Sequence, residues 1–128
     1  MPQLSSIFTQ KGEEFCVDKL CETSQNLPKY IGQGTGGTAG AKGNTDLEVP
    51  ATEARVTGIL SEGASDKIQV VGTIIADGTK IIKEFGLFDA AGSGSPPSGG
   101  VLISRITWTD TPVEVNDEVE YTITLEFQ

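Results

Sequence analysis

The chain has 128 residues, of which 16 are glycine, and a formal net charge of −9 at pH 7. A chain of this length fits a single domain, and its negative field disfavours phosphate backbones and anionic lipids, so we expect no nucleic-acid partner and no membrane partner. It contains no histidine, the most common general base in enzymes.

The first 28 residues are predicted to form an extended N-terminal arm. Their apolar residues are isolated and form no helical stripe longer than about two turns, so this segment has too little apolar surface for a core of its own. Within it, residues 5–11 are a candidate short strand and residues 13–22 a candidate short helix. We expect the arm to dock on the rest of the domain or on a neighbouring subunit.

Two cysteines, Cys16 and Cys21, lie in this arm. Their spacing matches neither a Cys-x-x-Cys redox motif nor a four-ligand zinc site. We predict two reduced thiols that pack as small apolar groups, and a local or intersubunit disulfide is the alternative.

A short strand predicted at residues 29–31 leads into a glycine-rich segment, residues 32–44. Glycine loses backbone entropy inside a regular element, so this segment is predicted to be a long surface loop. It contains the letters G-x-G-x-x-G, but a dinucleotide site requires that the glycines open into a helix, and no apolar helical stripe follows them. Residues 45–50 are predicted to be extended, with Pro50 at a sheet edge or a bend.

Strand-like segments follow one another at short intervals in the second half of the chain. Asp77 and Gly78 separate two of them, and this pair is a strong signal for a type I′ hairpin turn, so residues 67–76 and 80–89 are predicted to pair. The five predicted strands are Arg55–Leu60, Lys67–Ala76, Lys80–Asp89, Val101–Thr109 and Glu118–Phe127.

The last strand alternates apolar and polar side chains with a period of two, which places its apolar residues on one face of a sheet. With loops at 90–100 and 111–117, this strand spacing predicts an all-β fold, an antiparallel β-sandwich that is jelly-roll-like or immunoglobulin-like. We assign residues 1–28 to the arm and residues 29–128 to a single sandwich domain. The apolar members of the alternation are Val119, Tyr121, Ile123, Leu125 and Phe127.

Patterns typical of catalysis or metal binding do not stand out. No tight pair of carboxylates lies in an apolar setting, and no EF-hand-like run is present. We therefore predict a non-enzymatic protein with no catalytic residues, no cofactor and no metal. Trp108 shares a strand face with Leu102 and Ile106, which predicts core packing. A carbohydrate-binding module that uses Trp108, Tyr30 or Tyr121 is an alternative hypothesis.

Four stretches occur in a fixed order: residues 30–36 (YIGQGTG), 45–47 with 53–55 (TDL and EAR), 83–90 (KEFGLFDA) and 101–105 (VLISR). They resemble the motifs YIAxGTGT, TD…L…E…R, ITEvGLFDA and LLAR of a group of small structural proteins of tailed-bacteriophage virions. The resemblance covers about residues 30–128 and leaves the arm unmatched.

This resemblance implies a virion structural protein, and we expect a capsid decoration, or cement, protein that binds and stabilises the head lattice. The alternative is a tail-collar, baseplate or fibre-attachment subunit, because related patterns occur in tail proteins. The implied partners are other virion proteins, the major capsid protein or tail components, and a homo-oligomer with a trimer favoured. The implied location is the virion, after synthesis in the host cytoplasm without export, since residues 1–6 lack the features of a signal peptide.

Contacts with such partners are expected from the arm and from the two glycine-rich loops. A protein that repeats around a lattice needs only weak contacts per copy, because their sum is large. Deletion of residues 1–28 is expected to abolish particle binding and leave the sandwich folded. The predicted partner-binding residues are Ile7, Phe8, Phe15, Leu20, Gly34, Thr35 and Gly36.

Overall fold

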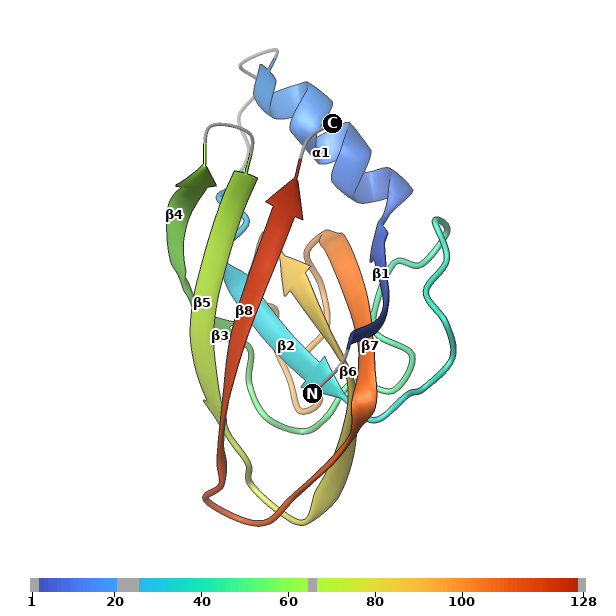
Figure 1. The fold of residues 1–128 in the computed structure, drawn as a ribbon, viewed down its shortest axis with the longest axis vertical. Coiled ribbons are helices and arrows are strands. Elements are labelled where there is room, and N and C mark those ends of the chain that lie inside the picture. Colours follow the sequence, from blue (N-terminus) through green and yellow to red (C-terminus); the bar gives the residue numbers. More distant parts are fainter. Residues whose placement is uncertain (1–2, 21–25, 65–66, 127–128) are drawn as a thin grey trace.

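The computed structural model describes residues 3–20, 26–64 and 67–126, and in the first stretch it places the side chains of residues 7–17 (Figure 1). Within these residues two antiparallel sheets pack together, which confirms the predicted all-β sandwich. The elements are β1 (Gln3–Phe8), α1 (Gln10–Leu20), β2 (Tyr30–Gly34), β3 (Val56–Thr57), β4 (Ile59–Ala64), β5 (Lys67–Ile75), β6 (Lys80–Phe88), β7 (Leu102–Val113) and β8 (Glu118–Glu126).

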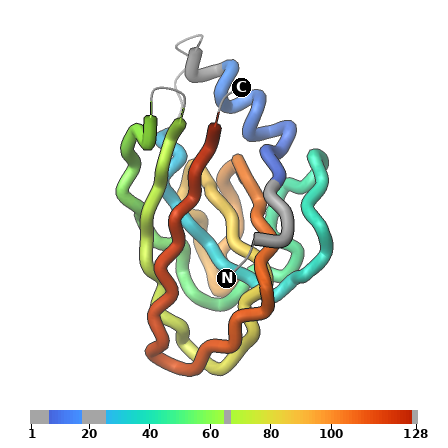
Figure 2. Tube along the Cα trace, viewed as in Figure 1, coloured from blue at the N-terminus to red at the C-terminus, as the bar shows by residue number. Residues whose placement is uncertain are grey.

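The two sheets differ in width. The larger sheet has five strands in the order β1-β7-β6-β2-β3, and the smaller sheet has three in the order β4-β5-β8. Only Gly58 separates β3 from β4, so the chain passes from one sheet to the other at this side of the sandwich. At the opposite side, β7 of the larger sheet continues past β8 (Figure 2).

The core lies between the two sheets. On β8 the predicted alternation is confirmed, because Val119 is half-buried, Tyr121, Ile123 and Leu125 are buried, and the glutamates and threonines between them are exposed. Phe127, the last member of the predicted alternation, lies outside the described residues. Apolar side chains from both sheets exclude water from this layer. The main cluster includes Ile31, Phe85, Leu87, Ile103 and Ile106 of the larger sheet and Val70, Ile74, Tyr121, Ile123 and Leu125 of the smaller sheet.

The N-terminal segment is not extended away from the domain, because it folds onto the larger sheet of the same chain. β1 pairs antiparallel with β7. The hydroxyl oxygen of Thr9 then caps α1 by accepting a hydrogen bond from the Gly12 amide at 2.9 Å. Phe15 of α1 is only 5% exposed and belongs to the core. Deleting residues 1–28 would therefore expose the β7 edge and open the core, so we no longer expect that deletion to leave the sandwich intact.

The first of the two cysteines is a free thiol that packs against the core. Cys16 is half-buried, and its burial, together with the nearby charge of Glu13, raises its pKa. Cys21 lies outside the described residues. The predicted redox state of the two cysteines therefore stays a prediction.

The predicted hairpin at Asp77-Gly78 is wrong. β5 pairs with β4 and β8 in the smaller sheet, whereas β6 pairs with β2 and β7 in the larger sheet. Neither turn residue has the positive φ that a type I′ turn requires. The turn instead crosses between the sheets, and Glu53 holds it, because its carboxylate accepts a hydrogen bond from the Asp77 amide at 2.9 Å and pairs with Lys80. The turn preference of Asp77 and Gly78 is local, so it cannot report the contact with Glu53, which is distant in sequence.

The short strand predicted before the glycine-rich segment continues into that segment as β2. Ile31 and Gln33 point toward the smaller sheet, where Ile31 joins the core and Gln33 accepts a hydrogen bond from the Tyr121 hydroxyl. Gly32 and Gly34 therefore lie on the opposite face of the larger sheet, which we call the outer face. Glycine has a weak strand preference, which is why the sequence pattern placed both residues in a loop.

Candidate interaction surface

Glycines on the outer face of the larger sheet allow a loop to pack directly against it. A Cβ atom on Gly34 would lie 2.5 Å from the Val49 carbonyl oxygen, and one on Gly36 would lie 2.5 Å from the Cβ of Glu48. Such distances leave no room for a larger side chain, so the two positions require glycine. Residues 34–50, which we call the glycine loop, therefore form a covering layer on this face.

The buried carboxylate of Glu84, in β6, holds the glycine loop in place. Glu84 has an exposed fraction of 0%. Its Oε2 accepts hydrogen bonds from the amides of Gly36 and Val49, and its Oε1 accepts one from the amide of Glu48, each at 2.8 Å. These amides lie near the two ends of the loop, so a single side chain closes it. Hydrogen bonds to an ionised acceptor are stronger than those between neutral groups.

Arg105 of β7 is the counterion of this carboxylate. Its Nε donates a hydrogen bond to Oε1 of Glu84 at 2.8 Å, and both side chains are buried. Removing one member of such a pair leaves an uncompensated buried charge, which is strongly destabilising. The pair therefore ties the glycine loop to both β6 and β7.

The guanidinium of Arg105 also has a donor that is not used within the described part of the chain. Its Nη2 is buried and has no hydrogen-bond partner among the described residues. Arg105 lines a hollow of about 320 Å³ whose other walls are residues 38–39 and 43–48. At the rim, hydrogen bonds from Thr38, and less strongly the charge of Arg105, lower the pKa of Glu48. The guanidinium of Arg105 thus places a positive charge beside the hollow.

A second buried arginine, Arg55, holds the loop at residues 90–100. Its Nη1 donates to the carbonyl oxygens of Ala90 at 3.1 Å and Gly99 at 2.7 Å. Its Cζ atom lies 3.5 Å from the centroid of the Phe88 ring, a cation–π contact. Burial lowers the pKa of Arg55, against the opposing effect of two nearby aspartates, and the group stays charged. Both loops are therefore fixed from beneath by buried charged side chains.

None of the predicted partner-binding residues whose side chains the structure describes is fully exposed. Three of them are buried: Phe15, Gly34 and Gly36. Three others are half-buried: Ile7, Phe8 and Thr35. The side chain of the seventh, Leu20, lies outside the described residues. The exposed positions of the two loops are instead residues 37–39, 41–43, 45, 48–49, 91–96 and 98–100.

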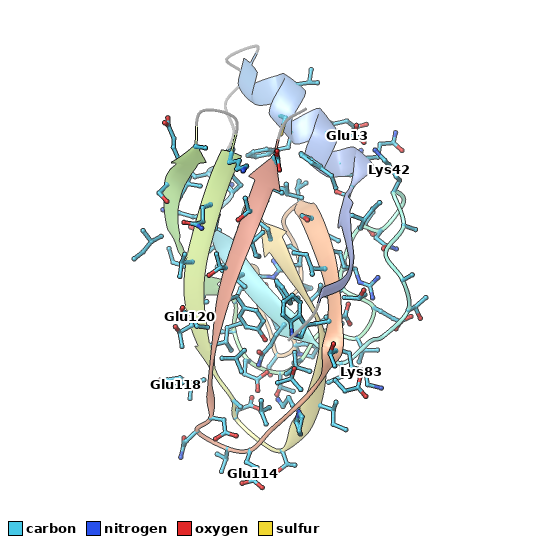
Figure 3. All side chains as sticks on the ribbon, viewed as in Figure 1. Glu13, Lys42, Lys83, Glu114, Glu118 and Glu120 are labelled. Carbon is cyan, nitrogen blue, oxygen red and sulfur yellow. The ribbon has the colours of Figure 1, made fainter. Side chains whose placement is uncertain are left out.

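The N-terminal segment and the glycine loop contact each other in this chain. The amide of Gln10 donates a hydrogen bond to the carbonyl oxygen of Lys42 at 3.0 Å. Lys42 and Glu13 form an ion pair and lie side by side in Figure 3. A Cβ atom on Gly40 would lie 2.6 Å from Cγ2 of Ile7. The two segments that were predicted separately as partner contacts therefore build one surface.

Sequence analysis does not single out the charged residues that build this surface, Glu84, Arg105 and Arg55. A signal is present, because Glu84 and Arg105 each interrupt an apolar strand segment. A charge at such a position is either solvated or buried with a partner. Whether these two charges are solvated or buried depends on the covering loop, and the sequence pattern predicts that this loop lies in solvent.

The described side chains form no group of three or more histidine, cysteine, aspartate or glutamate residues that could hold a metal ion. Trp108 packs against the core beside Phe85, with ring centroids 5.8 Å apart, as predicted. Leu102, which was predicted on the same strand face, belongs instead to a separate cluster with Leu47 and Phe88. Among the described residues no helix has both the length and the apolar composition of a membrane span.

Comparison of the chain with protein-family models, with curated proteins and with solved structures found no match.

Proposed function

We propose that this chain is a non-enzymatic structural protein of a tailed-bacteriophage virion, and that it is a capsid decoration, or cement, protein that binds and stabilises the head lattice. The observation that supports this proposal best is where the resembling stretches lie in the fold. Residues 30–36 form β2 and the start of the glycine loop, and residues 45–47 belong to the same loop. Residues 83–90 form most of β6, and residues 101–105 begin β7.

These stretches meet at the buried charges. Glu84 belongs to the KEFGLFDA stretch, Arg105 to VLISR and Arg55 to EAR. Glu84 and Arg55 each hold one of the two loops through hydrogen bonds to its backbone, and Arg105 is the counterion of Glu84. If the resemblance reflected only the general pattern of β-strands, the matching residues would be core residues alone. The overlap with loop-holding residues supports a shared surface, and hence a shared type of role.

A surface of this kind suits lattice binding. Loops that are already fixed lose little conformational entropy when they bind, so more of the contact energy appears as affinity. Many copies on a symmetric lattice then add up weak contacts. We therefore take the glycine loop and residues 90–100 as the contact surface, the major capsid protein as the partner, and a homo-oligomer, with a trimer favoured, as the assembled form.

Labelling of purified virus particles with an antibody against this chain tests the location. Label over the whole head is the result that we expect. Label confined to the tail would overturn the decoration role and favour a collar, baseplate or fibre-attachment subunit. Particles that carry none of the chain would overturn the virion role altogether.

A matched pair of variants tests the surface. Thr38→Arg puts a large cation at the rim of the hollow, and Thr73→Arg puts the same side chain at an exposed position of β5. We expect Thr38→Arg to reduce co-sedimentation of the purified protein with particles that lack it, and Thr73→Arg to bind as the original chain does. Equal binding by the two variants would exclude the glycine loop from the interface.

A further inference from the structure

Among the described residues the smaller sheet has two edge strands, β4 and β8, and the larger sheet extends beyond β8. β8 forms one edge of the smaller sheet and is 9 residues long, and no described strand pairs with its free side. In Figure 1, β7 and β1 of the larger sheet lie beyond this edge. An unpaired edge presents main-chain donors and acceptors to which another strand can bind.

A groove of about 590 Å³ lies between β8 and the larger sheet at this edge. Val119 and Tyr121 of β8 line one side of it, and Phe85 of β6 and Trp108 of β7 line the other. Trp108 and Val119 are only half-buried. Part of the apolar surface of the core is therefore accessible directly beside the unpaired strand.

We propose that β8 is an acceptor edge for an extended segment of a partner protein that alternates apolar and basic side chains. Such a segment would pair with the main chain of β8 and widen the smaller sheet to four strands, with affinity from main-chain bonds and specificity from side-chain pockets. Its alternate side chains would enter the groove and contact Trp108 and Phe85, and the others would lie beside the polar face of β8. This surface is separate from the glycine loop and does not depend on the virion role.

The charge of β8 selects a basic partner. Glu118 and Glu120 are exposed on its outer side, and Glu114 adds a carboxylate in the preceding turn (Figure 3). The cross-strand neighbours of Glu118 and Glu120 on β5 are Ile75 and Thr73, which carry no charge. A lysine or arginine opposite a glutamate on the added strand would stabilise the pairing, and a like charge would destabilise it.

A second copy of this chain fits the edge less well. If two β8 strands paired antiparallel about their central residue, Thr122, then Glu118 of each would face Glu126 of the other. Like charges directly opposite each other oppose such pairing. The net charge of −9 on each copy adds long-range repulsion. A separate, basic partner segment is therefore the occupant that the charges favour.

Tryptophan fluorescence can test the proposal, because the single tryptophan of the chain lines the groove. The probe is a synthetic peptide as long as β8 that alternates valine and lysine, and the control peptide has glutamate in place of each lysine. We expect the lysine peptide to shift the emission of Trp108 to shorter wavelength in a saturable way, and the glutamate peptide to leave it unchanged. Added salt should weaken the binding, because it screens exposed charges.

Charge reversal on β8 provides a matched control. Glu120→Lys changes the acceptor edge, and Glu62→Lys makes the same change at an exposed position of β4, the opposite edge of the smaller sheet. Glu120→Lys should weaken binding of the lysine peptide about three- to tenfold, and Glu62→Lys should leave it unchanged. The proposal would be overturned by the absence of any shift, by equal binding of the two peptides, or by a dimer of the free protein whose β8 edge excludes the peptide.

Discussion

The outer faces of the two sheets place charged residues in opposite environments. On the smaller sheet, the outward residues of β8 are exposed, and Glu118 is solvated. On the larger sheet, the glycine loop covers the outward residue Glu84 of β6, which is buried with three amides and a guanidinium. A glutamate on the outer face of a strand is thus solvated in the smaller sheet, at Glu118, and buried in a network of hydrogen bonds in the larger sheet, at Glu84. The covering loop, and the glycines that admit it, make the difference.

The largest expected effect on the free energy of unfolding comes from neutralising the buried carboxylate of Glu84. Glu84→Gln preserves the side-chain shape but leaves Arg105 without its counterion, so the free energy of unfolding should fall by about 3–5 kcal/mol. Urea unfolding followed by the fluorescence of Trp108 measures the loss. The matched change on the exposed face, Glu118→Gln, should alter the free energy of unfolding by less than about 0.5 kcal/mol. Equal losses from the two variants would contradict the contrast between the faces.

A smaller effect is expected from adding one methyl group beneath the glycine loop. Gly34→Ala would press a Cβ atom against the Val49 carbonyl oxygen, so we expect a loss of about 1–3 kcal/mol in the free energy of unfolding. Gly43→Ala is the control in the same loop, because nothing lies within 4 Å of an added Cβ atom there. If both variants were as stable as the original chain, the loop would not be packed against the sheet.

The contact between the two sheets at Tyr121 should contribute less. Tyr121→Phe removes the hydrogen bond from the hydroxyl to Oε1 of Gln33, which joins the smaller sheet to the larger one. We expect a loss of about 0.5–1.5 kcal/mol in the free energy of unfolding, measured by urea unfolding. Tyr30→Phe, a half-buried position outside this contact, serves as the control. A loss in Tyr30→Phe as large as that in Tyr121→Phe would argue against a specific bond between the sheets.

The smallest expected effect concerns acid sensitivity at the turn between the sheets. Hydrogen bonds from Lys80 and Thr52 lower the pKa of Asp77 from its usual 3.8 to about 2. A lowered pKa in the folded state means that the ionised group adds stability above pH 4, and that this contribution is lost as the pH falls toward 2. Asp77→Asn should therefore reduce the dependence of the free energy of unfolding on pH between about 4 and 2. An unchanged pH dependence in this variant would show that the contacts of Asp77 do not stabilise the fold.

The overall sandwich and strand β8 were predictable, because the side-chain alternation of β8 matches its burial. On this strand Tyr121 and Ile123 point inward and the glutamates point outward, as the period of two predicts. The predicted strand Arg55–Leu60 is instead split at Gly58, between β3 of the larger sheet and β4 of the smaller sheet. The strand boundaries of β5 and β6 were close to the prediction. Their pairing was wrong, because the turn between them is held by Glu53, a residue distant in sequence.

The interaction surface could not be predicted in the same way. Its glycines have a weak strand preference, so Gly32 and Gly34 were assigned to a loop although they lie in β2. The burial of Glu84 depends on residues 34–50 folding back over the sheet, and no local pattern reports that contact. The N-terminal segment has few apolar residues, yet pairing of β1 with β7 and burial of Phe15 attach it to the domain.

Amide hydrogen exchange measured residue by residue tests most directly the central claim that Glu84 holds the glycine loop as a packed layer. The amides of Gly36, Glu48 and Val49 donate to this buried carboxylate, so they should exchange slowly, like amides of the central strands. Exposed positions of the same loop, such as Gly43, should exchange much faster. Fast exchange at all of these positions would contradict the account.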